Sequence, residues 1–266
     1  MLKVMYYPGC TLKNKARDLD IYARKCAEVL GIEMEELERW QCCGGMFTSS
    51  SDEIVTKLSS VRALRDSAKA GEPLVTVCSA CHNVIKRTNH AMITNPEFAG
   101  KVNRYLGEDE SYDGTAKVCH YLEMLRDIVG FDKIKEKVQN PLKGRKIAAY
   151  YGCLLLRPGK VMAMDDAENP RIMEDLIRTL GAEPVIYPMR NECCGGYMAI
   201  EDKEAASARS LGVAKSAEGH GADIIVTACP LCRYNLMKSG ESIPVYYFTE
   251  LLAEALGVKE VSDDEE

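Results

Sequence analysis

The sequence predicts an α/β protein with an internal duplication: two similar Rossmann-like parallel-sheet halves, each carrying a five-cysteine Cys-Cys-Gly motif. Three observations indicate this fold. The same spacing of cysteines occurs twice. Short apolar runs alternate along the chain with stretches of helical periodicity. The chain has 266 residues, 46% of them hydrophobic, which is enough to build the core of one large domain or of two ordinary ones.

Ten of the twelve cysteines form two sets of five with almost the same spacing. The first set contains Cys10, Cys42, Cys43, Cys78 and Cys81. The second set contains Cys153, Cys193, Cys194, Cys229 and Cys232. In each set 34 residues separate the adjacent pair from the Cys-x2-Cys motif, whereas the gap before the pair is 31 residues in the first set and 39 in the second. This match indicates an internal repeat.

The first half is predicted to alternate between strands and helices. Residues 2–7 form a short β-rich run, and residues 16–31 form an amphipathic helix that Gly31 closes. A second helix is expected from about 52 to 70, followed by a buried strand at 73–77. Strands that alternate with helices predict a parallel sheet.

The second half repeats this order. The expected elements are strands at 146–151, 183–188 and 222–228, and helices at 170–181 and 201–219. Asn169 is predicted to be the N-cap of the first of these helices, with Pro170 at its first helical position. The same strand–helix alternation therefore predicts a second parallel sheet.

The ends of the two copies also match. Residues 117–130 align with 244–257, which places Cys119 opposite Tyr246. The stretch 138–146 contains Pro and Gly and is predicted to be the boundary between the halves. We expect a first domain at 1–140, a second domain at 145–258 and an acidic solvated tail at 259–266.

Composition and charge narrow the class of protein. The 34 Lys and Arg against 40 Asp and Glu give a net charge of −6, so we expect no nucleic-acid partner. The sequence lacks a secretory leader and an apolar run of membrane-spanning length, so we expect a cytoplasmic protein without a membrane span. In a reducing compartment, twelve cysteines indicate metal or redox chemistry rather than a disulfide framework.

The cysteines of each set are expected to converge on one edge of one sheet. Three elements of each set directly follow an apolar or aromatic run, and in parallel α/β folds functional loops lie at the carboxyl ends of strands. Cys81 and Cys232 lie one turn into the next helix, where the positive end of the helix dipole stabilises a thiolate. The glycine pairs 44–45 and 195–196 allow the backbone to approach an inorganic cluster.

Five thiolates per set leave three kinds of site open. A zinc site needs four ligands in a closed shell, and adjacent cysteines chelate one tetrahedral ion poorly. A cubane iron–sulfur cluster uses four cysteines, so the fifth would bridge two irons in a non-cubane cluster or remain a labile ligand. A vicinal disulfide would be strained. The adjacent pair favours a cluster of several metal atoms, with a zinc staple as the alternative.

Two cysteines and four histidines lie outside the two sets. Cys26 falls on the apolar face of its helix and is predicted to be a core residue. Cys119 is predicted to be a strand core residue or to line a cleft. His82 and His120 each follow a cysteine and are weak candidates for a catalytic proton donor, with a structural role favoured. The other histidines, His90 and His220, are expected on helix surfaces.

The whole pattern, from YYPGC to FTELLAEALG, resembles the duplicated CCG-domain family and, within it, the HdrB subunits of heterodisulfide reductases. The resemblance implies two non-cubane four-iron four-sulfur (4Fe-4S) clusters, each held by one set of cysteines. It implies that the clusters face each other across a cleft where a disulfide such as CoM-S-S-CoB is split into two thiols. The CCGGM and CCGGY stretches differ from the pattern of the methanogen proteins and leave the disulfide itself open.

The resemblance also implies partners. In that family electrons arrive from a ferredoxin-like iron–sulfur subunit (HdrC-like), which a flavin-containing subunit (HdrA-like) supplies. This chain has neither a Gly-x-Gly-x-x-Gly fingerprint nor a ferredoxin-type run of cysteines. The alternatives are an electron-transfer subunit, as in lactate or glycolate oxidation or quinone-linked fumarate reduction, and a zinc scaffold without redox activity. A substrate-sized cleft would distinguish the reductase from a relay, and metal content would reveal a scaffold.

Overall fold

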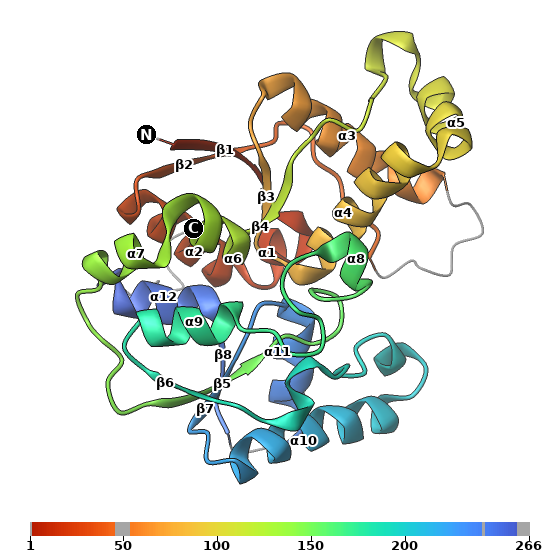
Figure 1. Ribbon diagram of the computed structural model, residues 1–266. Helices are drawn as coiled ribbons and strands as arrows, with labels where there is room; N and C mark the ends of the chain where they lie inside the picture. The colour runs from red at the N-terminus through yellow and green to blue at the C-terminus, as the bar shows by residue number, and fades with distance from the viewer. Residues whose placement is uncertain (1, 46–53, 241–242, 260–266) are drawn as a thin grey trace.

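In the computed structural model the chain forms two four-stranded parallel sheets, one in each half (Figure 1). The structure describes residues 2–45, 54–240 and 243–259. The first sheet has the order β2-β1-β3-β4 and contains β1 (Leu2–Tyr7), β2 (Ile32–Glu36), β3 (Leu74–Thr76) and β4 (Val118–His120). The second has the order β6-β5-β7-β8 and contains β5 (Lys146–Tyr150), β6 (Glu183–Val185), β7 (Ile224–Thr227) and β8 (Val245–Tyr247). The matching orders confirm the predicted duplication.

Helices connect the strands in both halves. Those of the first half are α1 (Gly9–Asn14), α2 (Arg17–Val29), α3 (Val55–Ala70), α4 (Ser79–Thr94), α5 (Pro96–Leu106), η1 (Glu108–Glu110), α6 (Tyr121–Glu123), the π-helical turn η2 (Met124–Val129) and α7 (Phe131–Lys137). Those of the second half are α8 (Gly159–Met162), α9 (Ile172–Thr179), η3 (Pro188–Asn191), η4 (Met198–Ile200), α10 (Lys203–Gly219), α11 (Pro230–Lys238) and α12 (Phe248–Ala255). Within the described ranges no helix is both long and apolar enough to cross a membrane.

Most elements lie where the sequence predicts them. The strands β1, β3, β5 and β7 match the four buried apolar runs within two residues at each end. The strand β6 ends at Val185, earlier than expected, because the chain turns into η3 at Pro188. The expected start of α3 near Asp52 and residues 260–266 of the acidic tail lie outside the described residues.

The start of α9 differs from the prediction. The helix begins at Ile172, two residues later than predicted, and Asn169 is not its N-cap. The carboxylate of Asp165 instead accepts hydrogen bonds from the backbone N–H groups of Arg171, at 2.6 Å, and Ile172, at 2.8 Å. The side-chain oxygen of Asn169 accepts a hydrogen bond from the guanidinium of Arg190. A long-range partner therefore takes the side chain that sequence reasoning assigned to a local cap.

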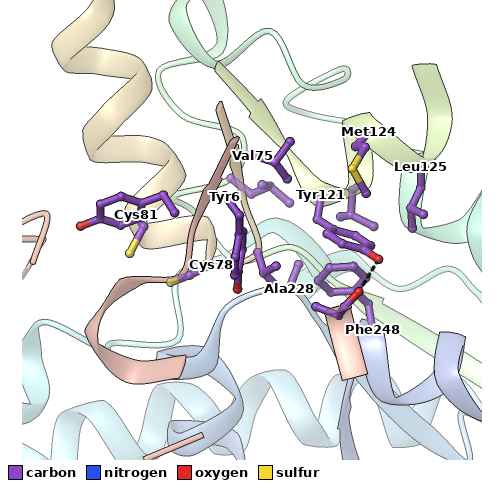
Figure 2. Close-up of a cluster of buried hydrophobic side chains, with 14 of the residues drawn as sticks. Tyr6, Val75, Cys78, Cys81, Tyr121, Met124, Leu125, Ala228 and Phe248 are labelled. Atoms are coloured by element: carbon purple, nitrogen blue, oxygen red, sulfur yellow. Dashed lines mark hydrogen bonds between the residues drawn. The ribbon is translucent and has the colours of Figure 1, made fainter. Parts of the chain in front are cut away.

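The two halves share one continuous hydrophobic core (Figure 2). Helix α12 of the second half packs against α2 of the first. Cys26 on α2 is fully buried, and its thiol lies 3.9 Å from the backbone oxygen of Thr249, which confirms that it is a core residue. The hydroxyl of Tyr121 donates to the backbone oxygen of Ala23 at 2.8 Å, and its ring lies 5.8 Å from that of Phe248. This core fixes one half against the other.

Candidate functional site

Two equivalent tyrosines hold the adjacent cysteine pairs at the ends of the central strands. The hydroxyl of Tyr7, which ends β1, donates to the backbone oxygen of Gln41. The hydroxyl of Tyr150, which ends β5, donates to the backbone oxygen of Glu192 at 2.7 Å. Each acceptor directly precedes a cysteine pair. Burial raises the pKa of both tyrosines, so both stay protonated and keep donating.

The first set of cysteines lies together at the carboxyl edge of the first sheet. The sulfur of Cys42 is 3.5 Å from that of Cys10, and the sulfur of Cys43 is 3.5 Å from that of Cys81. Cys10 and Cys42 are exposed, whereas Cys43, Cys78 and Cys81 are buried. The set therefore has one side toward solvent and one side toward the protein interior.

The second set repeats this arrangement with less exposure. The sulfur of Cys194 lies 3.5 Å from that of Cys232. The backbone N–H of Gly195 donates to the sulfur of Cys193 at 3.3 Å. Cys153 and Cys193 are half-buried. The structure thus gathers all five thiols of each set, as the strand-end argument predicts.

The two sets meet at their Cys-x2-Cys motifs. Cys78 and Cys229 are the residues that precede α4 and α11, and each thiol is close enough to shift the pKa of the other. Beside them, Ser79 donates to the backbone oxygen of Ala228 from its hydroxyl at 2.7 Å and from its backbone N–H at 3.1 Å. Ten thiols therefore occupy one region at the boundary between the halves.

The hydroxyl of Tyr247 links the backbone segments that lead into the two Cys-x2-Cys motifs. Its hydroxyl lies 2.8 Å from the backbone oxygen of Val77 and 2.9 Å from that of Ala228, the two residues that precede Cys-x2-Cys. His120 occupies the position equivalent to Tyr247, since each is the N-cap of a short helix with a capping box. Its Nε2 atom is 3.0 Å from the same oxygen of Val77. These buried donors fix the backbone on which the two motifs begin.

Hydrogen bonds among the thiols separate their pKa values. The bond from Cys42 is the largest cause that lowers the pKa of Cys43, and the bond from Cys153 is the largest cause that lowers that of Cys193. The pKa of Cys229 is lowered by hydrogen bonds from the second thiol of its own motif and from Cys78. In each half a lowered pKa favours the thiolate, the form of cysteine that binds metal.

The histidines are placed differently from one another. Both His82 and His120 are fully buried, and their rings lie 5.4 Å apart. His120 Nδ1 accepts a hydrogen bond from the backbone of Leu122, and burial lowers its pKa to about 3. Burial also lowers the pKa of His82, whose Nε2 is 3.4 Å from Glu123. Both rings are therefore neutral near pH 7, and His90 and His220 are exposed, as predicted.

Hollows next to the two sets differ in size. A cavity of about 20 Å³, room for about one water, lies among the cysteines of the second set, with Leu231 and Tyr197 in its wall. An open groove of about 570 Å³ borders Cys42 of the first set, with Arg62 and Tyr105 in its wall. The groove is large enough for a small molecule, whereas the cavity is not.

Most cations near the motifs are paired with carboxylates. The pairs are Lys13 with Glu36, Lys86 with Glu123, Arg157 with Glu168 and Arg233 with Glu250. Arg87 is exposed. A cation already paired with a carboxylate attracts an anionic substrate weakly, so these side chains form structural or solvated pairs.

The donors in each set suit a cluster of several metal atoms. The thiols lie in close pairs, with sulfur–sulfur distances of 3.5 Å in both sets. Close backbone approach gives further support: a Cβ atom on Gly9 would lie 2.8 Å from the sulfur of Cys81, and one on Gly152 would lie 3.1 Å from that of Cys232. An iron–sulfur cluster takes several cysteine thiolates as its protein ligands, and five thiols gathered in each set fit that requirement.

Sequence reasoning missed the residues that support the sets. Tyr7 and Tyr150 had a visible signal, because an aromatic pair precedes the first cysteine of each half. Tyr247 and Ser79 had none, since each reaches a backbone oxygen in the other half, Val77 for Tyr247 and Ala228 for Ser79. Long-range hydrogen bonds of this kind leave no local pattern.

Comparisons with known proteins agree with this architecture. The CCG family, described as a cysteine-rich domain, matches the chain twice, at residues 4–86 and 147–237. A protein from Helicobacter pylori described as hypothetical has a similar fold, with a TM-score of 0.73 at 12% identity over 97% of this chain and 49% of that one. At that identity the likeness concerns the fold alone.

Several relatives whose names describe a function match nearly the full length of this chain. The membrane anchor subunit of the 8-methylmenaquinol:fumarate reductase of Wolinella succinogenes is 31% identical, over 95% of this chain and 92% of its own. A protein of Archaeoglobus profundus described as similar to the HdrB subunit of heterodisulfide reductase is 32% identical, over 97% and 91%. The HdrB subunit of the ferredoxin/F420H2-dependent CoB-CoM heterodisulfide reductase of Methanosarcina acetivorans is 29% identical, over 97% and 90%. The chain belongs to the cysteine-rich CCG-domain family, among the proteins similar to the HdrB subunit of heterodisulfide reductase.

Proposed function

We propose that this protein is the iron–sulfur subunit of a cytoplasmic heterodisulfide reductase-like complex, in which it reduces a disulfide to two thiols. The observation that carries the proposal is that the Cys-x2-Cys motifs of the two complete five-thiol sets begin side by side, where Tyr247 contacts Val77 and Ala228 and where Ser79 contacts Ala228. Two separate staples would have no need to adjoin. The family match and the relatives of reductase description support the oxidoreductase class.

The ten motif cysteines are assigned as cluster ligands, the first set for one non-cubane 4Fe-4S cluster and the second set for the other. When bound, such clusters supply electrons singly, and a disulfide takes up two electrons and two protons as its S–S bond breaks. The chain's own contribution is position: Tyr247 and Ser79 fix the two motifs relative to each other. The two sets, held side by side in this way, would each hold a group that supplies one electron.

Both candidate histidines receive positioning roles in this proposal. His120 uses both ring nitrogens on the backbone, at Leu122 and Val77, and so has no proton to give. His82 is buried between His120 and Glu123, and burial keeps its ring neutral. The protons for the two thiols are assigned to solvent, because Cys10 and Cys42 open the first set to water.

Partners follow from the chemistry. The chain is assigned a ferredoxin-like iron–sulfur subunit as its immediate electron donor and a flavin-containing subunit as the source behind it. The relatives described as subunits of reductase complexes support this assignment. Because the net charge of the chain is negative, we propose no nucleic-acid partner.

A second candidate function is favoured by one relative and by the small volume of the cavity at the second set. The fumarate reductase subunit is as similar to this chain as the heterodisulfide reductase proteins are. The cavity at the second set, about 20 Å³, is too small for a disulfide substrate. Both observations fit an electron-transfer subunit. Such a subunit would pass electrons to a quinone-linked partner and cleave no bond.

Anaerobic turnover separates the two candidates. The intact protein is reduced with methyl viologen radical and then offered the coenzyme M–coenzyme B heterodisulfide, cystine or menadione. The reductase predicts two free thiols for every two viologen radicals oxidised with a disulfide, and the same yield from the Cys119→Ser variant, whose changed thiol lies outside the sets. Oxidation by menadione with no thiol from either disulfide would contradict the reductase and support the relay.

Close packing at Gly9 provides a further prediction. Gly9→Ala combines a positive φ of 76° with a Cβ atom 2.8 Å from the sulfur of Cys81, whereas Gly71→Ala has the same strain, at φ 74°, with open space around it. Both changes should cost about 1 kcal/mol of unfolding free energy from backbone strain. Only Gly9→Ala should also lower the iron content per chain, measured by elemental analysis. Equal iron content in both variants would show that the space beside Cys81 is not needed.

A further inference from the structure

The unequal gaps in the two cysteine sets correspond to a structural difference between the halves. After Cys153 the chain needs 39 residues to reach its cysteine pair, eight more than the 31 after Cys10. In the first half α1 is followed almost at once by α2, at Arg17. In the second half the longer stretch forms an arm, residues 154–169, which contains α8 and precedes α9.

The arm covers helix α4 of the first half (Figure 1). Asn83 on α4 is 2% exposed, and its side-chain nitrogen lies 2.7 Å from the backbone oxygens of both Leu154 and Arg157. It also lies 3.5 Å from the sulfur of Met162. The face of the helix that follows the first Cys-x2-Cys motif is therefore an internal interface.

Among residues 2–45, 54–240 and 243–259, none forms such a cover on the equivalent face of α11. The repeat places Tyr234 opposite Asn83 and Met237 opposite Lys86, since each lies the same distance after the last cysteine of its set. Tyr234 is 59% exposed and Met237 is 56% exposed. The first half lacks the eight residues that would build a second arm to cover them. A helix face that is buried in one copy of the repeat is thus open, and apolar, in the other.

This open face leads directly to the second set of cysteines. A groove of about 340 Å³ runs between α10 and α11, with Tyr234 on its wall. Its lining includes Ser210, whose hydroxyl donates to the backbone oxygen of Cys194 at 2.8 Å, and Asn235, whose side-chain nitrogen is 3.6 Å from the Cys194 sulfur. A molecule seated there is separated from a cluster ligand by one side chain.

We propose that the exposed face of α11, together with this groove, is the docking surface for the electron-donating iron–sulfur partner. The inference rests on the proposed function and adds the place where electrons enter: one electron would pass from the reduced partner to the iron–sulfur cluster that the second set would hold. A partner bound on this surface would cover α11 as the arm covers α4. Exposed Met198 and Ile200 in η4, whose Ala199 lines the groove, extend the apolar surface beyond α11.

Charge favours an acidic partner face. The charged side chains that line the groove are Lys203 and Lys238, both cations, in a chain whose net charge is −6. Small ferredoxin-type proteins with carboxylates around their cluster edge match such a surface, and complementary charge speeds encounter. Because the two lysines are exposed at a rim, their effect should decline with added salt.

The test uses a purified two-cluster ferredoxin as the probe and the intact anaerobic protein. Tyr234→Asp combined with Met237→Asp places negative charge on the face, and Ile93→Asp is the control, because Ile93 is 59% exposed at the far end of α4. We measure ferredoxin binding by fluorescence anisotropy, and cluster reduction by ferredoxin and by methyl viologen radical. We expect about a tenfold weaker Kd and slower ferredoxin reaction in the double variant alone. Viologen reduction, which needs no docking, should stay within about twofold.

Three results would overturn the inference. The first is equal binding and equal rates in the double variant and Ile93→Asp. The second is a wild-type protein that does not bind ferredoxin. The third is conversion of a dimer to a monomer by the double variant, which would make the face a contact between two copies of this chain. Failure of the proposed function gives a distinct result, because protein without clusters is reduced by neither donor.

Discussion

Replacing Cys43 with serine is expected to halve the iron that each chain holds, from about eight atoms to about four. Cys43 is buried, its sulfur lies 3.5 Å from that of Cys81, and hydrogen bonds from its neighbours lower its pKa. Loss of this thiolate removes a ligand from the centre of the first set. A serine hydroxyl stays protonated near pH 7 and does not replace it.

The matched variants make the result specific. Cys194→Ser should remove the iron of the second set, and the two changes together should leave almost none. Cys26→Ala should keep all of the iron, because Cys26 lies in the core between α2 and α12, outside both sets. Iron and labile sulfide are measured on protein purified without oxygen. Equal iron in Cys43→Ser and Cys26→Ala would contradict the assignment of Cys43 as a ligand.

Replacing Arg190 with methionine is expected to lower the free energy of unfolding by about 3–5 kcal/mol, because it leaves a buried carboxylate without its partner. Arg190 lies 2.8 Å from Glu174, which is 1% exposed, and Glu174 also accepts a hydrogen bond from the Tyr151 hydroxyl. Burial raises the pKa of Glu174, and Arg190 opposes that rise. Without Arg190 the carboxylate must take up a proton or remain charged in a dry site.

Denaturant unfolding of apoprotein under reducing conditions measures this loss. The control is Arg178→Met on α9, the helix that carries Glu174, because the half-exposed pair of Arg178 with Asp175 contributes about 0.5 kcal/mol or less. Adding Glu174→Met to Arg190→Met should recover most of the stability, since the unpaired charge is then gone. Equal losses in Arg190→Met and Arg178→Met would contradict the network. Arg190 lies three residues before Cys193, so the second set also depends on it.

Local pattern was enough to predict the duplication, the parallel sheets and the edge where the cysteines gather. Strand β2 was missed because it is an edge strand in which Ile32 is buried while Glu33 and Glu35 face solvent, so its sequence has little apolar content. The N-cap at Asn169 was wrong because Arg190, far away in the sequence, takes its side-chain oxygen. Sequence reasoning sees the repeat but not the contacts between its copies.

The arm at residues 154–169 is a second feature whose contacts with the other half could not be predicted from the sequence. The difference between gaps of 31 and 39 residues was visible, yet only the fold shows that the extra residues cross to the other half and bind Asn83. From the sequence, Tyr247 likewise resembles any aromatic residue of a strand. Only the structure shows that its hydroxyl lies between the backbone oxygens of Val77 and Ala228. Both features join the halves, which is where local patterns carry least information.

In the proposed site each half holds one iron–sulfur cluster on its five thiols. Iron, acid-labile sulfide and zinc per chain, measured on wild-type protein purified without oxygen, test it most directly. We expect about eight iron and about eight sulfide with no stoichiometric zinc. One or two zinc without sulfide would contradict it and leave a duplicated metal-stapled scaffold, and about four iron would mean that one half holds no cluster, so that cleavage of a disulfide from both sides would fail.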